Sequence, residues 1–500
     1  MHTCIYKPSL MEKHLLSKST FIRGLQCFKS LYLYKNYYHL KDPIAPELQA
    51  VFNRGHRVGN LAQQLFPGGV DCAPTKRFKY LESVAKTKEL INNGQEVIYE
   101  ATFQVERVLI MLDILVKRDG KWFAYEVKSS TKISDTYITD AAIQYYVITN
   151  SGLKLEDISI VHIDNHYILK EELKLDQYFK TISVKDRILE IQPRLNKQVK
   201  EMKAVIFERD IPAKEIGKHC FSPYQCDYLG HCWKGKKDAE IFSLAGIGKE
   251  GQVALFEKGI RKFSDISSDE QLSKSQKIQI KSEPVLKKDN IQKFLTQLEF
   301  PLWFLDFETV QYAVPKYEGV KPYQQIPFQY SLHKLEEDSK LSHSYFLAEP
   351  GIDPRASFTK SLFDTVGQEG SVIVYNATFE KMIVKQLYEW FPEKKLEAQH
   401  MIKRFVDLMK PFQAKDYYLP EMHGSHSIKA VLPALCKEMS YKNLAINNGH
   451  IAAMAYNELQ SSSDMFRIEE VKQNLLEYCK LDTLAMVKIY EKLIEITQNR

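Results

Sequence analysis

Residues 107–129 read RVLIMLDILVKRDGKWFAYEVKS. Asp119-Gly120 is a strong signal for a two-residue hairpin turn, because both residue types tolerate the backbone angles that such turns require. The runs on either side are rich in residues that favour strands. We therefore predict a β-hairpin in which residues whose numbers sum to 239 lie opposite each other.

This predicted register places Asp113 opposite Glu126, with their Cβ atoms roughly 5 Å apart. Lys128 lies two residues beyond Glu126 and so points to the same face of the sheet. Neighbouring carboxylates repel each other unless a cation lies between them, and Mg²⁺ or Mn²⁺ accepts such oxygen ligands. A nearby lysine can stabilise charge on a phosphate. The pattern is equally compatible with the exposed face of an ordinary hairpin.

The spacing D-x12-E-V-K resembles the PD-(D/E)XK nucleases, and within them the RecB-like branch. That resemblance implies a metal-binding histidine on a preceding helix, and His56 in the helix-like stretch Phe52–Gly69 matches it. It also implies that Gln144, on the helix after the hairpin, contacts nucleic acid. Ile148 stands where the family has tyrosine, which weakens the second match.

Three cysteines, Cys220, Cys226 and Cys232, are evenly spaced in HCFSPYQCDYLGHCW. With Cys27 as a fourth ligand, the arrangement resembles the iron–sulfur RecB-like nucleases, which implies a 4Fe-4S cluster held by four thiolates. A four-cysteine Zn²⁺ site is the alternative, as are unrelated buried cysteines. The remaining cysteines are expected to be packing residues: Cys4, Cys72, Cys436 and Cys479.

A turn with the sequence Gly246-Ile247-Gly248-Lys249 joins two helical segments and resembles a helix-hairpin-helix. Backbone N–H groups at the start of the second helix would suit a phosphate, with Lys249 adding charge. An ordinary turn between helices explains the same glycines.

The second acidic pattern begins in LWFLDFET, residues 302–309, where an apolar strand ends in Asp306 and Glu308. These acids are two residues apart, so they project from one face. In residues 371–383, SVIVYNATFEKMI, a strand turns into a helix at Asn376. In the helical residues 475–493, Tyr478 and Asp482 lie one turn apart.

Together these three segments resemble the DEDD exonucleases of the RNase H-like fold, of the type with a tyrosine in the third motif. The resemblance implies a two-metal site built from Asp306, Glu308 and Asp482, with Tyr478 orienting the attacking water. Glu380 stands where the second motif usually has aspartate, and Asp407 is an alternative fourth acid. Further residues expected to face nucleic acid are Asn376, His426 and Lys429.

The chain has 500 residues, which is too long for one ordinary core. We predict an α/β protein with three parts: a PD-(D/E)XK (restriction-endonuclease-like) domain at 1–238, a helical connector at 239–295, and an RNase H-like domain at 296–500. The net charge of 69 − 63 = +6 permits a polyanionic partner. Because the sequence has no apolar stretch that could span a membrane and no apolar leader, we expect a cytoplasmic protein.

These patterns predict a metal-dependent nuclease with two active sites, acting on DNA and cutting from single-stranded or free ends, in DNA repair, in DNA processing or in defence against foreign DNA. Three alternatives stay open. One site could be active while the other module only binds nucleic acid. The substrate could be RNA, or the protein could be a non-catalytic adaptor whose acids are structural.

Overall fold

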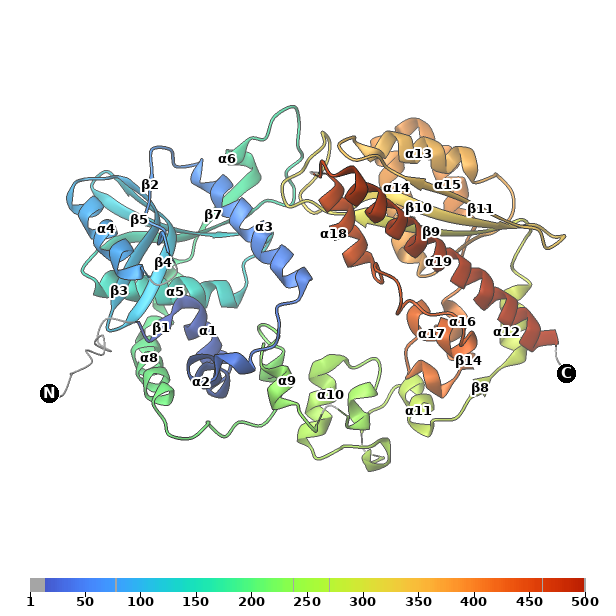
Figure 1. Ribbon diagram of the computed structural model, residues 1–500, viewed down its shortest axis with the longest axis horizontal. Helices are drawn as coiled ribbons and strands as arrows, with labels where there is room; N and C mark the ends of the chain where they lie inside the picture. The colour runs from blue at the N-terminus through green and yellow to red at the C-terminus, as the bar shows by residue number, and fades with distance from the viewer. Residues whose placement is uncertain (1–13, 77–78, 237, 269, 461, 499–500) are drawn as a thin grey trace. The chain divides into compact units, whose positions relative to one another are not determined.

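The computed structural model describes residues 14–76, 79–236, 238–268, 270–460 and 462–498 (Figure 1). Cys4 and the start of the chain lie outside these ranges. The protein divides into two compact units. Unit 1 comprises Met1–Lys237 together with Ala313–Pro322, and unit 2 comprises Asp238–Tyr312 and Tyr323–Arg500. Both units combine helices with a β-sheet, so the chain is of the α/β type.

Unit 1 contains a seven-stranded sheet with the order β2-β3-β4-β5-β6-β7, and β1 pairs with β4. Its strands are β1 (Leu16–Ser17), β2 (Val70–Asp71), β3 (Val97–Val105), β4 (Val108–Arg118), β5 (Lys121–Lys128), β6 (Leu155–Ile163) and β7 (Phe179–Ser183). Its helices are α1 (Lys18–Gln26), α2 (Phe28–Asn36), α3 (Pro46–Gln63), α4 (Tyr80–Asn92), α5 (Asp135–Asn150), α6 (Leu175–Tyr178), α7 (Lys185–Leu189), α8 (Gln192–Ile206) and α9 (Leu229–Cys232).

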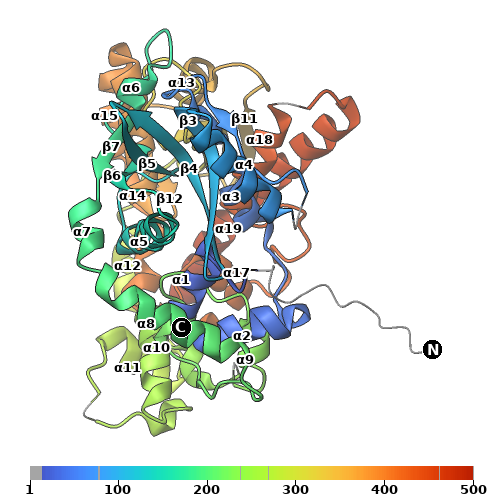
Figure 2. The ribbon, with the colours of Figure 1, turned by 90° about the vertical axis from the view of Figure 1, so that its left-hand side faces the viewer.

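Strands β4 and β5 form the hairpin that the sequence predicts. Ile114 pairs with Tyr125 and Arg118 with Lys121, so the predicted register is confirmed. Asp119 and Gly120 have φ values of 49° and 73°. A two-residue hairpin turn of this type requires a positive φ at both positions. The buried residues of β3 to β6 share one apolar core with α1, α5 and α8. Figure 2 shows α5 nearly end-on beside these strands.

Residues 313–322, which the sequence-based boundaries assign to the C-terminal domain, belong to unit 1. Leu169 exchanges backbone hydrogen bonds with this segment, accepting one from Gly319 at 2.7 Å and donating one to Val320 at 3.0 Å. The Tyr178 hydroxyl donates to the Ala313 carbonyl at 3.0 Å. The chain therefore enters unit 1 a second time between two strands of the unit 2 sheet.

Unit 2 contains a five-stranded sheet with the order β11-β10-β9-β12-β13 and a two-stranded sheet of β8 and β14. Its strands are β8 (Val285–Leu286), β9 (Leu302–Val310), β10 (Ile326–Leu335), β11 (Leu341–Leu347), β12 (Val372–Val374), β13 (Phe405–Asp407) and β14 (Tyr417–Tyr418). Its helices are α10 (Gly248–Glu257), α11 (Lys274–Lys281), α12 (Lys288–Leu295), α13 (Pro354–Thr365), α14 (Ala377–Trp390), α15 (Lys395–Lys403), α16 (Lys410–Gln413), α17 (Ile428–Leu435), α18 (Gly449–Leu459) and α19 (Met465–Gln498).

The central strand β9 has two faces of different character. Trp303, Leu305 and Phe307 point into an apolar core shared with α13, α14 and α15. Because side chains alternate along a strand, Asp306 and Glu308 point to the opposite face, on which α18 and α19 pack (Figure 1). The alternation thus brings the two acids of β9 against the long helix α19.

The connector predicted at 239–295 groups with unit 2. It consists of short 3₁₀ segments (Glu240–Ser243 and Phe263–Asp265), α10, α11, β8 and α12. Across the described ranges, no helix combines the length and apolar composition that a membrane crossing requires.

Candidate functional site

The unit 1 hairpin brings Asp113 and Glu126 together, as the sequence predicts. The Val127 N–H donates to Asp113 Oδ2 at 2.5 Å, which fixes this carboxylate beside the strand that carries Glu126. Glu126 is only 1% exposed. Its Oε1 atom accepts from Lys128 Nζ and from Lys18 Nζ, each at 2.7 Å. Lys18 begins α1, and its position in this site was not anticipated from the sequence.

The two carboxylates of the hairpin have opposite electrostatic character. Burial and the charge of Glu126 raise the pKa of Asp113 to about 8. Burial also disfavours the charge on Glu126, but Lys128 and Lys18 outweigh it and hold its pKa well below the usual range. The site therefore favours the ionised form of Glu126, whereas Asp113 favours binding of a proton or a cation.

Three further polar residues complete this site. Gln144, which we expected to contact nucleic acid, is fully buried, and its Nε2 donates to Glu126 Oε2 at 2.8 Å. Asp140 accepts from Lys128 at 2.6 Å. Glu100 lies at an irregular point of β3 with φ 50°, where burial raises its pKa to about 7. An irregular strand position re-aims a side chain, so no sequence periodicity indicated Glu100.

His56 lies on α3, as expected, but its side chain is exposed. No contact found among the described residues joins it to Asp113 or Glu126. Glu100 is a further candidate metal ligand of the hairpin, and the metal-binding role of His56 stays a prediction. The charge of Glu100 raises the pKa of Asp113, which indicates that these two carboxylates are neighbours.

In unit 2, Asp306, Glu308 and Asp482 converge. Each offers a carboxylate oxygen, and these oxygens all lie within 4.8 Å of one another. Two come from β9 and the third from α19, so they meet only because α19 packs on that face of the sheet. No other three His, Cys, Asp or Glu residues in the described part of the chain gather their ligand atoms so closely. The donor set fits a hard divalent cation such as Mg²⁺ or Mn²⁺.

The electrostatics of this triad reflect repulsion among its members. Burial and the charges of Asp482 and Glu308 raise the pKa of Asp306 well above its usual value. Burial and Asp482 raise the pKa of Glu308 to about 8, and burial raises that of Asp482 to about 6. Such shifts mean that the ionised form of the cluster is stabilised poorly without a cation.

Tyr478 lies one turn before Asp482 on α19, and its hydroxyl lowers the pKa of that carboxyl. A second tyrosine, Tyr441, donates to Asp482 Oδ1 at 2.8 Å. Lys429 lies with its Nζ 5.4 Å from the ring centres of both tyrosines. Tyr441 belongs to an irregular segment without periodicity, so sequence reasoning missed it.

Cys479, expected to be a packing residue, is fully buried. Its thiol nevertheless touches the site, donating to Asp306 Oδ2 across 3.8 Å. The buried position agrees with the expectation, while the contact with an acidic residue does not follow from the sequence.

The second motif lies at the start of α14. Asn376 adopts φ 79° between β12 and this helix, and the predicted strand-to-helix turn is confirmed. Asp407 at the end of β13 accepts the backbone N–H groups of Asn376 at 3.0 Å and Ala377 at 3.1 Å. Its carboxylate is therefore committed to this turn, which argues against Asp407 as a fourth metal ligand.

Glu380 is 3% exposed, and among the described residues no hydrogen-bond partner contacts its Oε2 atom. Burial raises its pKa to about 8. It lies outside the group within 4.8 Å, although its charge still acts on Asp306. The structure thus places Glu380 near the triad but does not join it to the triad.

Two other predicted nucleic-acid contacts lie in loops whose backbone is held by hydrogen bonds, and their binding role stays a prediction. The His426 carbonyl accepts from the Tyr375 hydroxyl at 2.7 Å, so this residue helps to fix the loop before α17. In the connector, α10 begins at Gly248, and both Gly246 and Gly248 have positive φ values. Gln276 of α11 donates to the Ala245 carbonyl at 2.9 Å, which holds the turn before Lys249.

All four cysteines predicted to bind a cluster line one small cavity of about 20 Å³. They are Cys27, Cys220, Cys226 and Cys232. No three of these sulfur atoms lie within 4.8 Å of one another. The lining offers four thiols, a donor set that a thiolate-bound metal can use.

The family and the relative to which this chain is similar have no stated activity. Residues 303–427 match a domain of unknown function (DUF2779). The match contains β9 with its two acids and the start of α14, but it ends before Tyr441 and α19. An uncharacterised protein, UU173, from Ureaplasma parvum serovar 3 is 28% identical over 209 residues, which covers 37% of this chain. The chain spans only 30% of the length of that relative.

Proposed function

We propose that this protein is a metal-dependent nuclease that hydrolyses phosphodiester bonds of nucleic acid. The observation that carries the proposal is the triad of Asp306, Glu308 and Asp482, whose oxygens meet within 4.8 Å. Buried like charges are costly unless a cation is shared among them. A metal-free scaffold would have little physical reason to gather these three acids on one face of a sheet.

The neighbouring residues suit hydrolysis of a phosphodiester. Divalent ions held by such acids activate water and stabilise the leaving oxygen. Tyr478 carries a hydroxyl beside Asp482 that can orient the attacking water, and Lys429 brings a positive charge toward the scissile phosphate. The order and elements of the three segments support the resemblance to DEDD exonucleases of the RNase H-like fold. Glu380, whose Oε2 atom has no hydrogen-bond partner among the described residues, offers a further carboxylate near the triad.

The unit 1 hairpin supplies the second proposed nuclease site, of the RecB-like PD-(D/E)XK type. Asp113, Glu126 and Glu100 offer carboxylate oxygens, and Lys128 lies beside them. Because Lys18 contacts Glu126 directly, a divalent ion has to compete with this ammonium group. DNA is the favoured substrate and exonucleolytic cleavage the favoured mode. RNA, or one active site beside a nucleic-acid-binding platform, is the alternative.

The cysteine cavity supports a 4Fe-4S cluster as a further component, with Zn²⁺ as the alternative. The loop between Cys220 and Cys226 carries Tyr224. Burial raises the pKa of its hydroxyl, and the charges of Lys128, Asp140 and Lys18 also act on it. A metal that fixes this loop would therefore also hold Tyr224 near the hairpin site. Iron and zinc analysis of anaerobically purified protein decides between the metals, and protein without either metal contradicts the proposal.

Digestion of end-labelled single- and double-stranded DNA and RNA, with Mg²⁺ or Mn²⁺, tests the proposed function. The variants are Glu126→Gln, Asp306→Asn and the double variant. Each single variant should retain the cleavage made by the other site, and the double variant should retain none. Cleavage that persists undiminished in the double variant would exclude both assignments.

A further inference from the structure

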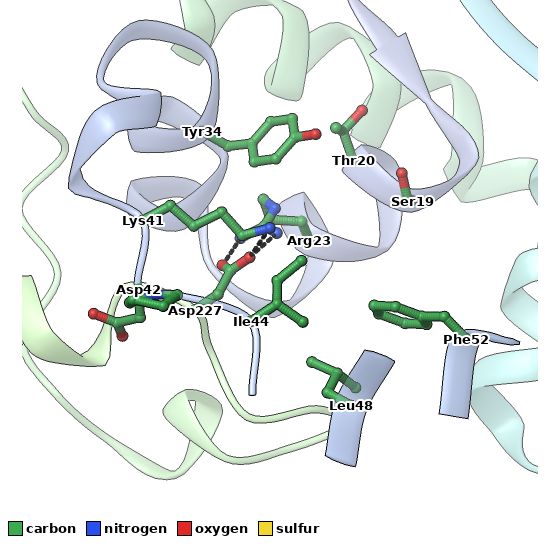
Figure 3. Close-up of a pocket in the computed structure, with 11 residues that line it drawn as sticks. Ser19, Thr20, Arg23, Tyr34, Lys41, Asp42, Ile44, Leu48, Phe52 and Asp227 are labelled. Atoms are coloured by element: carbon green, nitrogen blue, oxygen red, sulfur yellow. Dashed lines mark hydrogen bonds and ion pairs between the residues drawn. The ribbon is translucent and has the colours of Figure 1, made fainter. Parts of the chain in front are cut away.

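Unit 1 has a pocket of about 250 Å³ between α1 and α3 (Figure 3). One wall is apolar and open to solvent. Leu48 and Phe52 of α3 are each 45% exposed, and Ile44, in the loop before α3, is 46% exposed. In Figure 3 the Ile44, Leu48 and Phe52 side chains gather along the same side of the pocket. Three large apolar side chains left open around one hollow indicate a binding surface.

The opposite side of the pocket carries charged groups of both signs. Asp227 is bound by Arg23, at 2.5 and 2.9 Å, and by Lys41 at 3.1 Å. Together with Asp42, which also lines the pocket, these charges sum to 2 − 2 = 0. The carboxylate of Asp42 points away from the apolar wall in Figure 3 and accepts from the Gly230 N–H at 3.0 Å. The guanidinium of Arg23 also lies 4.6 Å from the centre of the Tyr34 ring.

The pocket adjoins the hairpin site through the first turn of α1. Ser19 and Thr20 line the pocket. Lys18, the residue before them, donates to Glu126 at 2.7 Å. Consecutive residues of α1 therefore line the pocket and contact the hairpin site.

A ligand that suits both sides combines a flat apolar surface with a group that Lys41 can bind, and it can extend beyond the pocket. A nucleotide with its base unstacked has all three properties, whereas the bases of a duplex are already stacked on one another. We infer that this pocket binds one nucleotide of a single strand, with the base against Phe52, Ile44 and Leu48 and a phosphate toward Lys41. This inference rests on the proposed function, because it identifies the substrate of the hairpin site as single-stranded nucleic acid.

Binding of a fluorescein-labelled oligothymidylate to the full chain, measured by anisotropy with a metal chelator present, tests the pocket directly. Phe52→Ala should weaken binding by roughly 5- to 150-fold, the range expected when one base loses the aromatic ring on which it stacks. Phe207→Ala is the matched control, because Phe207 is 61% exposed in the same unit and lies outside the pocket. Its affinity should equal that of the unchanged protein.

The salt dependence of the same binding tests the phosphate contact. Lys41→Gln should lower the slope of log affinity against log salt by about 0.7, the value for one phosphate contact on a single strand. Lys197→Gln, at a lysine whose side chain is 82% exposed on α8, should leave the slope unchanged. Melting curves confirm that each variant is folded.

The outcomes separate the inference from the proposed function. In the Asp306→Asn chain, only the hairpin site is intact. The pocket inference is wrong if this chain cuts single strands while Phe52→Ala binds oligothymidylate as tightly as Phe207→Ala does. If that chain cuts nothing but oligothymidylate binding depends on Phe52, the hairpin nuclease is wrong and the pocket stands. The single-strand assignment is also wrong if a blunt duplex binds as tightly as oligothymidylate and its binding depends on Phe52. It is equally wrong if oligothymidylate does not bind at all.

Discussion

In unit 1, Glu126 contacts two ammonium groups, those of Lys18 and Lys128. In unit 2, the hydrogen-bond partners of the acids are neutral: Tyr441 donates to Asp482, and the Cys479 thiol donates to Asp306. The first site therefore has ammonium groups in direct contact with a carboxylate. In the second, the charge of Lys429 acts on Glu308 and Asp482 without an ion pair among the described residues, and their pKa values stay raised. Two acidic sites that look alike in sequence should thus respond in opposite ways when a carboxylate is removed.

The largest expected effect is on catalysis at the unit 2 triad. Asp306→Asn removes one ligand charge with almost no change in volume. It should lower cleavage by this site more than about 100-fold, beyond the 10- to 100-fold typical of residues that only support a ligand. The rate is measured in a Glu126→Gln background with Mn²⁺. The metal-free protein should melt no lower than the unchanged one, because the substitution relieves repulsion.

Asp338→Asn, at an exposed turn of unit 2 where the Asp338 side chain accepts from the Lys340 N–H, is the matched control for loss of a carboxylate charge. It should leave the rate unchanged. An Asp306→Asn protein with an undiminished rate would show that the triad does not catalyse cleavage.

The next effect is the pH dependence of metal binding. The raised pKa values, about 8 for Glu308 and about 6 for Asp482, mean that the folded metal-free protein holds protons that the unfolded chain loses near pH 4. Unit 2 should therefore lose stability as pH rises toward 8. Because Mn²⁺ displaces these protons, its affinity should rise about tenfold per pH unit for each proton displaced.

Calorimetric titration of the Glu126→Gln protein with Mn²⁺ at pH 6, 7 and 8 measures this dependence. The same titration in buffers of different ionisation enthalpy counts the protons released. An affinity that does not change over this range would mean that the three carboxylates are already ionised without metal.

Removing a carboxylate from the unit 1 site should lower stability, whereas Asp306→Asn in unit 2 should not. Glu126→Gln removes the carboxylate that Lys18 and Lys128 contact, and breaking a buried pair costs up to about 5 kcal/mol. The two lysine side chains are 27% and 16% exposed, so water offsets part of that cost. We expect a loss of about 2 kcal/mol in the free energy of unfolding, measured by urea titration of the metal-free protein. A stabilised Glu126→Gln protein would contradict the contrast between the sites.

Local patterns predicted the parts of both sites that lie within one element or across one turn. The register that pairs Asp113 with Glu126 follows from a single turn, and the shared face of Asp306 and Glu308 follows from strand alternation. Neither rule reaches Lys18, which contacts Glu126 from 108 residues away. Tyr441 lies in an irregular segment and Glu100 at an irregular strand position, where periodicity carries no information. Tertiary packing decides these positions.

The smallest expected effect concerns Tyr441 and distinguishes support of a ligand from catalysis. Tyr441→Phe keeps the ring, which is 6% exposed, and removes the hydroxyl that donates to Asp482 at 2.8 Å. Loss of this bond should weaken Mn²⁺ binding about tenfold, as for other residues that orient a ligand. It should also raise the pKa of Asp482 and so move the rise of activity to higher pH. Tyr478→Phe is the matched substitution on α19. Because its hydroxyl also lowers the pKa of Asp482, it should weaken Mn²⁺ binding as well, but it should lower the rate even at saturating Mn²⁺, because its proposed role is to orient water. If Tyr441→Phe changes neither the affinity nor the pH profile, Tyr441 only packs against Tyr478, and the unit 2 acids bind their cation without its help.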